Sequence, residues 1–261
     1  MHRFSEFCFY PVHLKSTNTP KTGWSRRYST DRLPAAGVNL KVCAFCGVML
    51  LFFLVIAEAA TSYAAENRDV VISTFGQKDL SRWQQKEFEG TTSYTFSRDD
   101  AKKWVLKAHS NGTASGLARE IEVDLSKTPY LNWSWKIEKF PEVENERSKK
   151  GDDYPARIYV IFSTGPWFWD TRALNYVWST AMPVGESWPN AFTSKARMIA
   201  VQSGGDRIGG WVTEKRNVRE DIATLFGIQV DTIEAIALMT DTDNSSSEAV
   251  AYYGDIYFSA D

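Results

Sequence analysis

Apolar and polar side chains alternate along most of the chain after residue 65, which is the pattern of strands with one buried face. In residues 131–137 every odd position is large and apolar and every even position is polar. The same alternation predicts strands at residues 104–108, 117–125, 156–162, 173–179, 197–202, 233–239 and 250–258. Because turn residues rather than helices separate these strands, we expect an all-β fold: an antiparallel β-sandwich of jelly-roll type.

One segment follows a helical period instead. Its apolar residues are Val218, Ile222, Leu225 and Phe226. Asn217 is placed to cap the first turn, Glu220 stands three residues later, and Gly227 follows the last apolar residue. A capping asparagine at one end and a glycine at the other are common helix limits. We therefore predict one short helix at residues 218–226, covering an end or an edge of the sandwich.

The apolar run at residues 42–57 has no polar side chain and follows a basic segment rich in Ser and Arg. Small residues come after it, with Ser62 and Ala64 suited to cleavage after Ala64. This order predicts an export signal. The run is shorter than the roughly 20 residues that span a bilayer, although an uncleaved signal anchor remains an alternative.

These segments give the predicted domain organisation. Residues 1–41 form an unstructured leader, or result from a start site assigned too far upstream. Residues 42–64 form the signal peptide or signal anchor, and residues 65–261 form a single β-sandwich domain. The predicted location is periplasmic or secreted, and the alternative is anchoring in the inner membrane with the domain facing the periplasm. The domain would then contact a membrane only through an uncleaved anchor.

Export restricts the chemistry of the domain. All three cysteines, Cys8, Cys43 and Cys46, precede the predicted cleavage site, and His109 is the one histidine after it. Disulfide frameworks, thiolate metal sites and histidine-cluster zinc sites are therefore excluded. Residues 1–64 also hold seven of the 30 basic and three of the 32 acidic residues, so the remainder has a net charge near −6. An acidic domain is not expected to bind nucleic acid.

Several polar and aromatic residues are candidates for ligand binding. Asp152, Asp153 and Arg157 lie where a charged loop enters a strand, although an Arg–Asp salt bridge in a solvated loop would give the same pattern. Trp167, Trp169 and Trp188 stand in predicted loops, where aromatic rings suit stacking against a sugar but also suit ordinary packing. Trp133 and Trp135 alternate on a strand and are expected in the core. The predicted ligand-binding residues are Asp152, Asp153, Arg157, Trp167, Trp169, Asn175, Trp188 and Arg216.

Asp241, Asp243 and Asn244 offer hard oxygen ligands suited to a structural calcium ion. The helix–loop–helix calcium motif does not fit, because Ser246 stands where that motif needs glycine and Tyr252 where it needs glutamate. The alternative is a polar hairpin, which Asp and Asn favour through turn chemistry alone. We predict a calcium site at these three residues and leave the hairpin alternative open.

Several motifs together resemble the bacterial domain-of-unknown-function family 3047. They are residues 150–157, 173–178, 211, 214–218, 221–227, 239–244 and 253–256, and the resemblance spans about residues 70–259. It implies an exported bacterial protein and brings no settled activity, so no catalytic residues can be transferred. The closing pattern of an apolar strand, an Asp-rich hairpin and a Tyr-Gly-Asp strand is also similar to jelly-roll carbohydrate-binding modules, a likeness of architecture.

The leading functional hypothesis is an exported jelly-roll domain that binds a carbohydrate or another cell-envelope ligand. A glycoside hydrolase is one alternative, and it would need two carboxylates about 5–5.5 or 6.5–9.5 Å apart in one cleft. The acids available for it are Asp152, Asp153, Asp241, Asp243 and Glu214. A structural or assembly module of the envelope is the other alternative. Catalytic residues cannot be named from the sequence, and a non-enzymatic protein is favoured.

Overall fold

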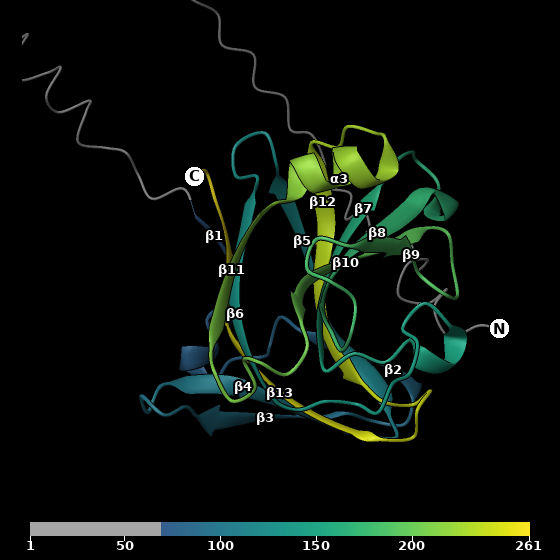
Figure 1. Cartoon of the computed structure of the whole chain (residues 1–261). Helices are drawn as coiled ribbons and strands as arrows, with labels where there is room; N and C mark the ends of the chain where they lie inside the picture. Colours follow the sequence, from purple (N-terminus) through teal and green to yellow (C-terminus); the bar gives the residue numbers. More distant parts are fainter. Residues whose placement is uncertain (1–68) are drawn as a thin grey trace, which may run out of the picture. The chain divides into compact units, whose positions relative to one another are not determined.

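The computed structural model describes residues 69–261, which form two packed β-sheets and one α-helix (Figure 1). The strands are β1 (Val70–Ser73), β2 (Gln84–Glu89), β3 (Ser93–Arg98), β4 (Trp104–Asn111), β5 (Ala114–Asp124), β6 (Tyr130–Lys139), β7 (Ala156–Ser163), β8 (Thr171–Ser179), β9 (Ser187–Pro189), β10 (Ala196–Ser203), β11 (Val212–Asn217), β12 (Thr232–Asp241) and β13 (Glu248–Ser259). The helix is α3 (Val218–Phe226). Short 3-10 helices are η1 (Phe75–Gln77), η2 (Lys149–Gly151) and η3 (Phe168–Asp170).

The first sheet has six strands in the order β11-β6-β13-β4-β3, with β1 paired to β13 beside this path. The second sheet has seven strands in the order β2-β5-β12-β7-β8-β10-β9. Both sheets combine strands from distant parts of the sequence, as in a jelly roll. The fold predicted from the alternation of apolar and polar residues is confirmed, as is each of the eight predicted strands.

Five strands were not predicted, and four of them close the edges of the two sheets: β2, β3, β9 and β11. Most of these edge strands bury few side chains, which weakens the period of their sequences. In β2, for example, Phe88 is the single residue that is not exposed. The fifth strand, β1, has only four residues. Low burial or short length hides these strands, except β3, in which Tyr94 and Phe96 alternate with polar residues.

One pair departs from the antiparallel pattern. Strand β10 pairs with β8 in parallel, while β9, which lies in the chain between them, pairs with β10 in the antiparallel direction. Parallel neighbours need a crossover connection rather than a hairpin. Residues 180–195 supply this crossover and carry β9 to the edge of the seven-stranded sheet.

The core lies between the inner faces of the two sheets and is rich in aromatic rings. Trp133 and Trp135 of β6 are 1 % and 0 % exposed, which confirms their predicted burial. The ring centroid of Trp133 lies 5.3 Å from that of Tyr176 on β8, and Trp135 lies 5.8 Å from Trp178 on the same strand. Aromatic contacts therefore join the two sheets across the sandwich.

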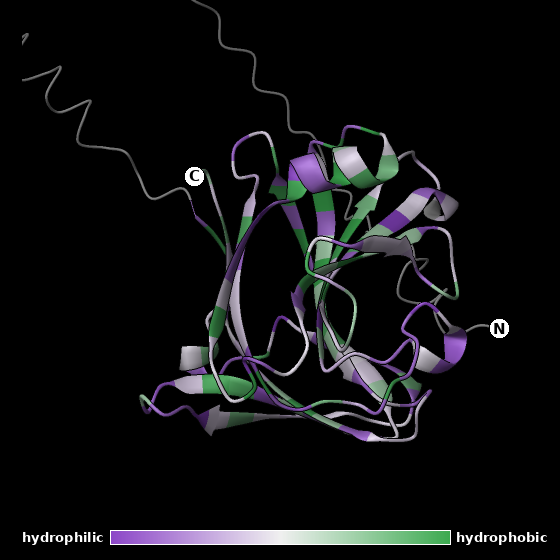
Figure 2. Cartoon of the chain, viewed as in Figure 1, coloured by the Kyte–Doolittle hydropathy of each residue, from purple (hydrophilic) through white to green (hydrophobic). Residues whose placement is uncertain are grey.

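The predicted helix is confirmed with its limits. The side chain of Asn217 accepts a hydrogen bond from the backbone N–H of Glu220 (3.2 Å), and Gly227 ends the helix with φ at 69°. A positive φ of this kind favours glycine. Val218 and Ile222 are fully buried, and Figure 2 shows that α3 carries both hydrophilic and hydrophobic residues. The helix thus covers one end of the core with its apolar face.

The Asp-rich segment after β12 forms a turn, but the strands beside it do not pair as a hairpin. Strand β12 belongs to the seven-stranded sheet and β13 to the six-stranded sheet, so residues 242–247 cross between sheets. Within residues 69–261, no helix is long and apolar enough to cross a membrane. The predicted leader at 1–41 and the predicted signal at 42–64 lie outside the described residues.

Candidate functional site

Arg157 is the centre of a buried charged cluster on the outer face of β7. Its neighbours Ala156 and Ile158 face the core, so alternation points Arg157 to the other side of the sheet. The side chain is fully buried, and Nη2 donates to the carboxylate of Asp241 at the end of β12. Nη1 lies 3.7 Å from Oδ2 of Asp152. The cluster therefore joins the loop before β7 to the end of β12.

Asp152 is 1 % exposed, and burial raises the pKa of its carboxyl to about 7. The charge of Arg157 and the Nδ2 group of Asn190, which donates to both carboxylate oxygens at 3.1 Å, oppose this rise. Burial likewise raises the pKa of Asp241 well above its usual value, again against the influence of Arg157. The single guanidinium thus compensates the buried acids only in part.

Asp153 contacts a different segment of the chain from Asp152. It is fully buried and accepts three hydrogen bonds from the segment after β12. The donors are the backbone N–H of Asn244 (3.2 Å), its Nδ2 group (3.0 Å) and the backbone N–H of Ser245 (2.6 Å). Asp153 therefore fixes the loop that carries the predicted cation ligands.

Two of the three predicted cation ligands, Asp241 and Asp243, gather in the structure together with Asp153, whereas Asn244 turns its Nδ2 donor toward them. Carboxylate oxygens of Asp153, Asp241 and Asp243 all lie within 4.8 Å of one another. Asn244 contacts two of them, because its Nδ2 group donates to Asp153 at 3.0 Å and to Asp243 at 3.1 Å. Carboxylates at this spacing fit a hard cation such as calcium. Sequence reasoning missed Asp153 as a third acid here, because it lies about ninety residues before the other two.

Asn175 shares the outer face of the seven-stranded sheet with Arg157. It lies on β8, in register with Tyr159 of β7 and Met198 of β10. The side chain is fully buried, yet neither its amide oxygen nor its amide nitrogen has a hydrogen-bond partner among residues 69–261. A buried amide without partners is rare in native structures. The amide of Asn175 is therefore a buried polar group whose hydrogen bonds the described residues do not satisfy.

Arg216 does not join this group. It lies on β11 in the other sheet, and its guanidinium forms two hydrogen bonds with the carboxylate of Asp221, at 3.0 and 2.6 Å. The hydroxyl of Tyr176 donates to the same carboxylate at 2.7 Å. Tyr176 belongs to the core cluster, so this contact lies on the opposite side of β8 from Asn175. Arg216 therefore lies apart from Arg157 and Asn175, in the other sheet.

Trp167 and Trp169 form a stacked pair at the surface. Their ring centroids are 5.1 Å apart with an interplanar angle of 9°, and the side chains are 59 % and 49 % exposed. Figure 1 shows η3, which carries Trp169, near the top of the domain beside β8. Two large apolar rings are thus held together in contact with solvent, where single exposed aromatics are the more usual case.

The loop that carries this pair is fixed by hydrogen bonds. Asp170 accepts from the backbone N–H of Trp167 through Oδ2 (3.1 Å) and from the hydroxyl of Thr164 through its backbone oxygen (3.0 Å). Lys195 Nζ donates to the backbone oxygen of Trp169 at 2.8 Å. A side chain at Gly165 would collide with the carboxylate of Asp170. These hydrogen bonds therefore hold the loop in place.

Trp188 differs from this pair. It lies on β9, is 2 % exposed and packs among Tyr154, Val177 and Met198. Its ring is therefore part of a small buried cluster on the outer side of the seven-stranded sheet. The loop position of Trp188 in the sequence did not reveal this, because β9 is only three residues long.

The acids considered for glycoside hydrolysis are buried or paired. Asp152, Asp153 and Asp241 are at most 1 % exposed. Glu214 lies in the other sheet on β11, where it accepts a hydrogen bond from Gln202 Nε2 at 2.8 Å and burial raises its pKa. None of these acids lines the pocket formed by β1, the segment after η1 and β5.

Comparison with known proteins gives one family and a set of distant folds. The profile of a family described as "Protein of unknown function (DUF3047)" matches residues 81–257. No match was found among curated protein sequences.

Solved structures with a similar fold include two carbohydrate-binding modules of Clostridium thermocellum cellulosomal cellulases. The family 11 module of Lic26A-Cel5E has 10 % identity and a TM-score of 0.41, covering 76 % of this chain and 97 % of that one. The family 30 module of Cel9D-Cel44B has 10 % identity and a TM-score of 0.42, covering 74 % and 98 %. The endoglucanase cel12A from Rhodothermus marinus has 10 % identity and a TM-score of 0.39, covering 68 % and 97 %.

Proposed function

The chain belongs to the DUF3047 family, and from its geometry we propose that the jelly-roll domain binds a carbohydrate through the Trp167–Trp169 pair. The observation that carries this proposal is the exposure of two rings stacked 5.1 Å apart on a fixed loop. A pyranose ring has an apolar face that packs on an indole ring and a polar rim that forms hydrogen bonds.

The fixed loop supports binding for an energetic reason. Ordering a flexible loop or side chain on binding costs free energy, about 0.5–1.5 kcal/mol for each immobilised rotamer-rich side chain. Asp170, Thr164 and Lys195 already hold the loop by hydrogen bonds. The loop is therefore already ordered in the folded protein, so binding needs little further ordering free energy. The apolar area of the rings remains available to a ligand.

The test is calorimetric titration of the full chain with a panel of cell-envelope and plant-type glycans. We expect at least one glycan to bind, and the double variant Trp167→Ala/Trp169→Ala to weaken binding by about 2 kcal/mol or more, as for central aromatic contacts in other interfaces. The variant Trp167→Phe/Trp169→Phe should retain part of the affinity, because it keeps two aromatic faces.

Val184→Ala is the matched control, because Val184 is 63 % exposed and lies outside the loop of the pair. It should leave binding unchanged. Binding that survives the double alanine variant, or a panel in which no glycan binds, would remove the proposal. Release of new reducing ends from a bound glycan would favour the hydrolase alternative instead.

We also propose a structural calcium ion at Asp153, Asp241 and Asp243, with Asn244 beside them. Three carboxylates within 4.8 Å of one another support it, because they repel one another unless a cation lies between them. Arg157 is already engaged with Asp152 and Asp241. A melting temperature that is equal in calcium and in chelator would contradict a tightly held ion.

Export remains part of the proposal. The apolar run at 42–57 and the small residues after it support a signal at residues 42–64 and a periplasmic or secreted domain. Cell fractionation combined with the intact mass of the mature protein is the test. A mass corresponding to residues 65–261 would fit cleavage after Ala64, and a full-length protein in the cytoplasm would contradict export.

A further inference from the structure

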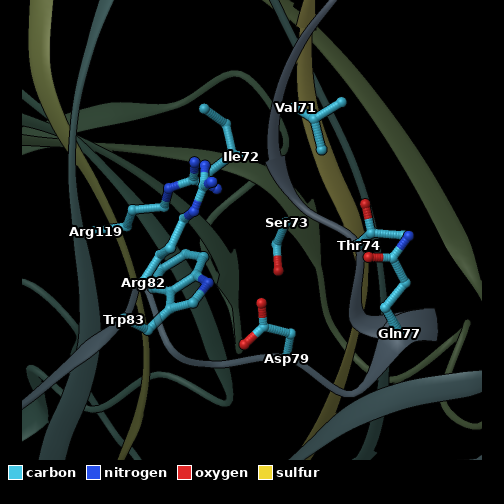
Figure 3. Close-up of a pocket in the computed structure, with 9 residues that line it drawn as sticks. All are labelled: Val71, Ile72, Ser73, Thr74, Gln77, Asp79, Arg82, Trp83 and Arg119. Atoms are coloured by element: carbon cyan, nitrogen blue, oxygen red, sulfur yellow. The ribbon is translucent and has the colours of Figure 1, made fainter.

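A pocket of about 250 Å³ opens between β1, the segment after η1 and β5, away from the residues discussed so far (Figure 3). The volume is several times the roughly 30 Å³ that one water occupies in the liquid. Its floor is apolar, because Ile72 is fully buried and Trp83 is 9 % exposed. Its polar groups include Ser73, Asp79, Arg82 and Arg119. The pocket is therefore large enough for a small polar ligand.

Arg119 is the unusual residue of this pocket. It lies on β5 and is 8 % exposed, but it forms no hydrogen bond or ion pair within the described part of the chain. Burial lowers its pKa, and the positive charge of Arg82 lowers it further, while Asp79 acts in the opposite direction. An arginine that is buried without a partner costs free energy unless a counter-charge approaches it.

Arg82 adds a second positive charge at the same place. Figure 3 shows the guanidinium groups of Arg82 and Arg119 on one side of the pocket, with Asp79 and Ser73 below and beside them. Arg82 also has no hydrogen bond or ion pair with residues 69–261. Two like charges next to an open volume attract an anion, and arginine forks match the oxygens of phosphate, sulfate and carboxylate groups.

Ser73 supplies an independent observation. It is 4 % exposed, and its hydroxyl has no hydrogen-bond partner among the described residues. In Figure 3 the hydroxyl points toward the carboxylate of Asp79, and the two guanidinium groups lie to its side. A buried hydroxyl without a partner is costly, and a ligand oxygen at this position would satisfy it.

Asp79 does not fill the role of the missing anion. Its carboxylate accepts from the backbone N–H of Ser81 at 2.7 Å, and within residues 69–261 it forms no ion pair with Arg82 or Arg119. The exposed position of Asp79 also leaves its charge largely screened by solvent. The polar lining thus carries two positive charges and one negative charge.

We propose that this pocket binds an oxyanion, with Arg82 and Arg119 holding its oxygens and the Ser73 hydroxyl donating a further hydrogen bond. The oxyanion is a phosphate, sulfate or carboxylate group, either as a free ion or as the acidic substituent of a sugar or other small molecule. This site is separate from the Trp167–Trp169 pair and does not depend on the proposed carbohydrate binding.

The experiment measures the melting temperature and calorimetric binding of the full chain in sodium phosphate, sulfate, acetate and glucuronate. Sodium chloride of equal ionic strength is the reference. We expect at least one oxyanion to raise the melting temperature in a saturable way beyond chloride. The ion that acts most strongly identifies whether the pocket prefers a tetrahedral or a planar group.

Four variants sharpen the test. Arg82→Gln and Arg119→Met should each weaken oxyanion binding about tenfold or more, since each removes charge-assisted hydrogen bonds. Asp79→Asn should strengthen it, because it removes the one negative charge of the pocket. Arg219→Gln is the control and should leave binding unchanged. Arg219 lies on α3 and forms an exposed ion pair with Asp231.

Two outcomes overturn the proposal. One is that no oxyanion stabilises the protein more than chloride does. The other is that oxyanion binding is the same in Arg82→Gln and Arg119→Met as in the unaltered chain. Arg82 is exposed, so its variant tests the pocket even where Arg119→Met fails to fold.

Discussion

Two arginines of the seven-stranded sheet show opposite electrostatic surroundings. Arg157 on β7 is fully buried between Asp152 and Asp241, and these carboxylates raise its pKa well above the usual value although burial alone would lower it. Arg119 on β5 is 8 % exposed, and burial together with Arg82 lowers its pKa. Arg157 is therefore stabilised by what the chain supplies, and Arg119 is not.

The comparison shows how a buried arginine that is paired within the chain can be told from one that could bind an anionic ligand. Burial alone does not separate them, because both arginines are almost inaccessible to solvent. The two arginines differ in whether a carboxylate lies within a few ångströms of the guanidinium group. Arg157 has several carboxylates around it, and the calcium ion proposed above would add positive charge there. Arg119 and Arg82 have an excess of positive charge and a pocket beside them.

The largest expected effect is the loss of the compensated arginine. Arg157→Met should lower the free energy of unfolding by about 3–5 kcal/mol, because it leaves buried acids without their cation. Urea unfolding at pH 7 measures this change. Arg219→Met, which breaks an exposed ion pair, should cost less than about 1 kcal/mol. If the two variants lose equal stability, Arg157 does not hold the cluster together.

The next effect tests the excess of acid. Calcium at one hundred times its Kd should raise the free energy of unfolding by about 2.7 kcal/mol. Asp243→Asn should remove most of this response, because it removes one of three converging carboxylates. The control is Asp255→Asn, at an exposed position of β13 outside the cluster. An equal calcium response in both variants would place the ion elsewhere.

The third expected effect is on the stability of Arg119→Met, which should not fall as that of Arg157→Met does. Without added oxyanion, Arg119→Met should leave the stability unchanged or raise it by about 1 kcal/mol, since it removes a buried charge that has no partner. The same urea titrations in chloride measure it. A loss as large as that of Arg157→Met would show that Arg119 is compensated within the chain, and the comparison would fail.

The smallest effect concerns Glu146, a buried acid with hydrogen bonds but no cation. It is 3 % exposed and accepts from Ser179 Oγ (2.5 Å) and the backbone N–H of Thr180, yet burial raises its pKa. A raised pKa means that the folded state binds the proton more tightly than the unfolded state. Its contribution to stability is therefore present below the unfolded pKa and is lost as the pH rises through the folded value.

Glu146→Gln tests this dependence, because glutamine carries no charge at any pH. The stability of the variant relative to the unaltered chain should improve as the pH rises from 4 to 8. Urea midpoints across this range measure the difference. A difference that stays constant with pH would show that hydrogen bonds from Ser179 and Thr180 fully compensate the carboxylate.

The sequence allowed the frame of the fold to be predicted because inner strands and α3 carry strong periods. Trp133 and Trp135 on β6 alternate with polar residues, and Asn217 and Gly227 mark the helix limits. Most edge strands escaped prediction because few of their side chains are buried, as in β2, or because they are very short, as in β9. The parallel pairing of β8 and β10 also escaped, since it depends on the path of the intervening chain.

The candidate sites were predictable only where their residues are close in sequence. Trp167 and Trp169 are two positions apart, and Asp241 and Asp243 follow one strand. Asp153 joins the second group across about ninety residues of chain, through backbone donors of Asn244 and Ser245. Nothing in the sequence indicates such a contact.

The arginine pocket was missed for a similar reason. Ser73 lies on β1, Arg82 lies in the segment that precedes β2, and Arg119 lies on β5. None of the three belongs to a recognisable motif. Periodicity shows which side of a strand is buried, but it does not show whether a buried charge has a counter-charge. That information appears only when the strands are packed.

The hydrophilic edge strand β2 has a consequence for the behaviour of the protein at high concentration. An edge strand presents unpaired backbone donors and acceptors that can extend a sheet into another molecule. Lys86, Glu87 and Glu89 are exposed along β2, so a second copy that pairs with this edge must bring charged side chains together. This strand therefore protects the domain from sheet-to-sheet aggregation.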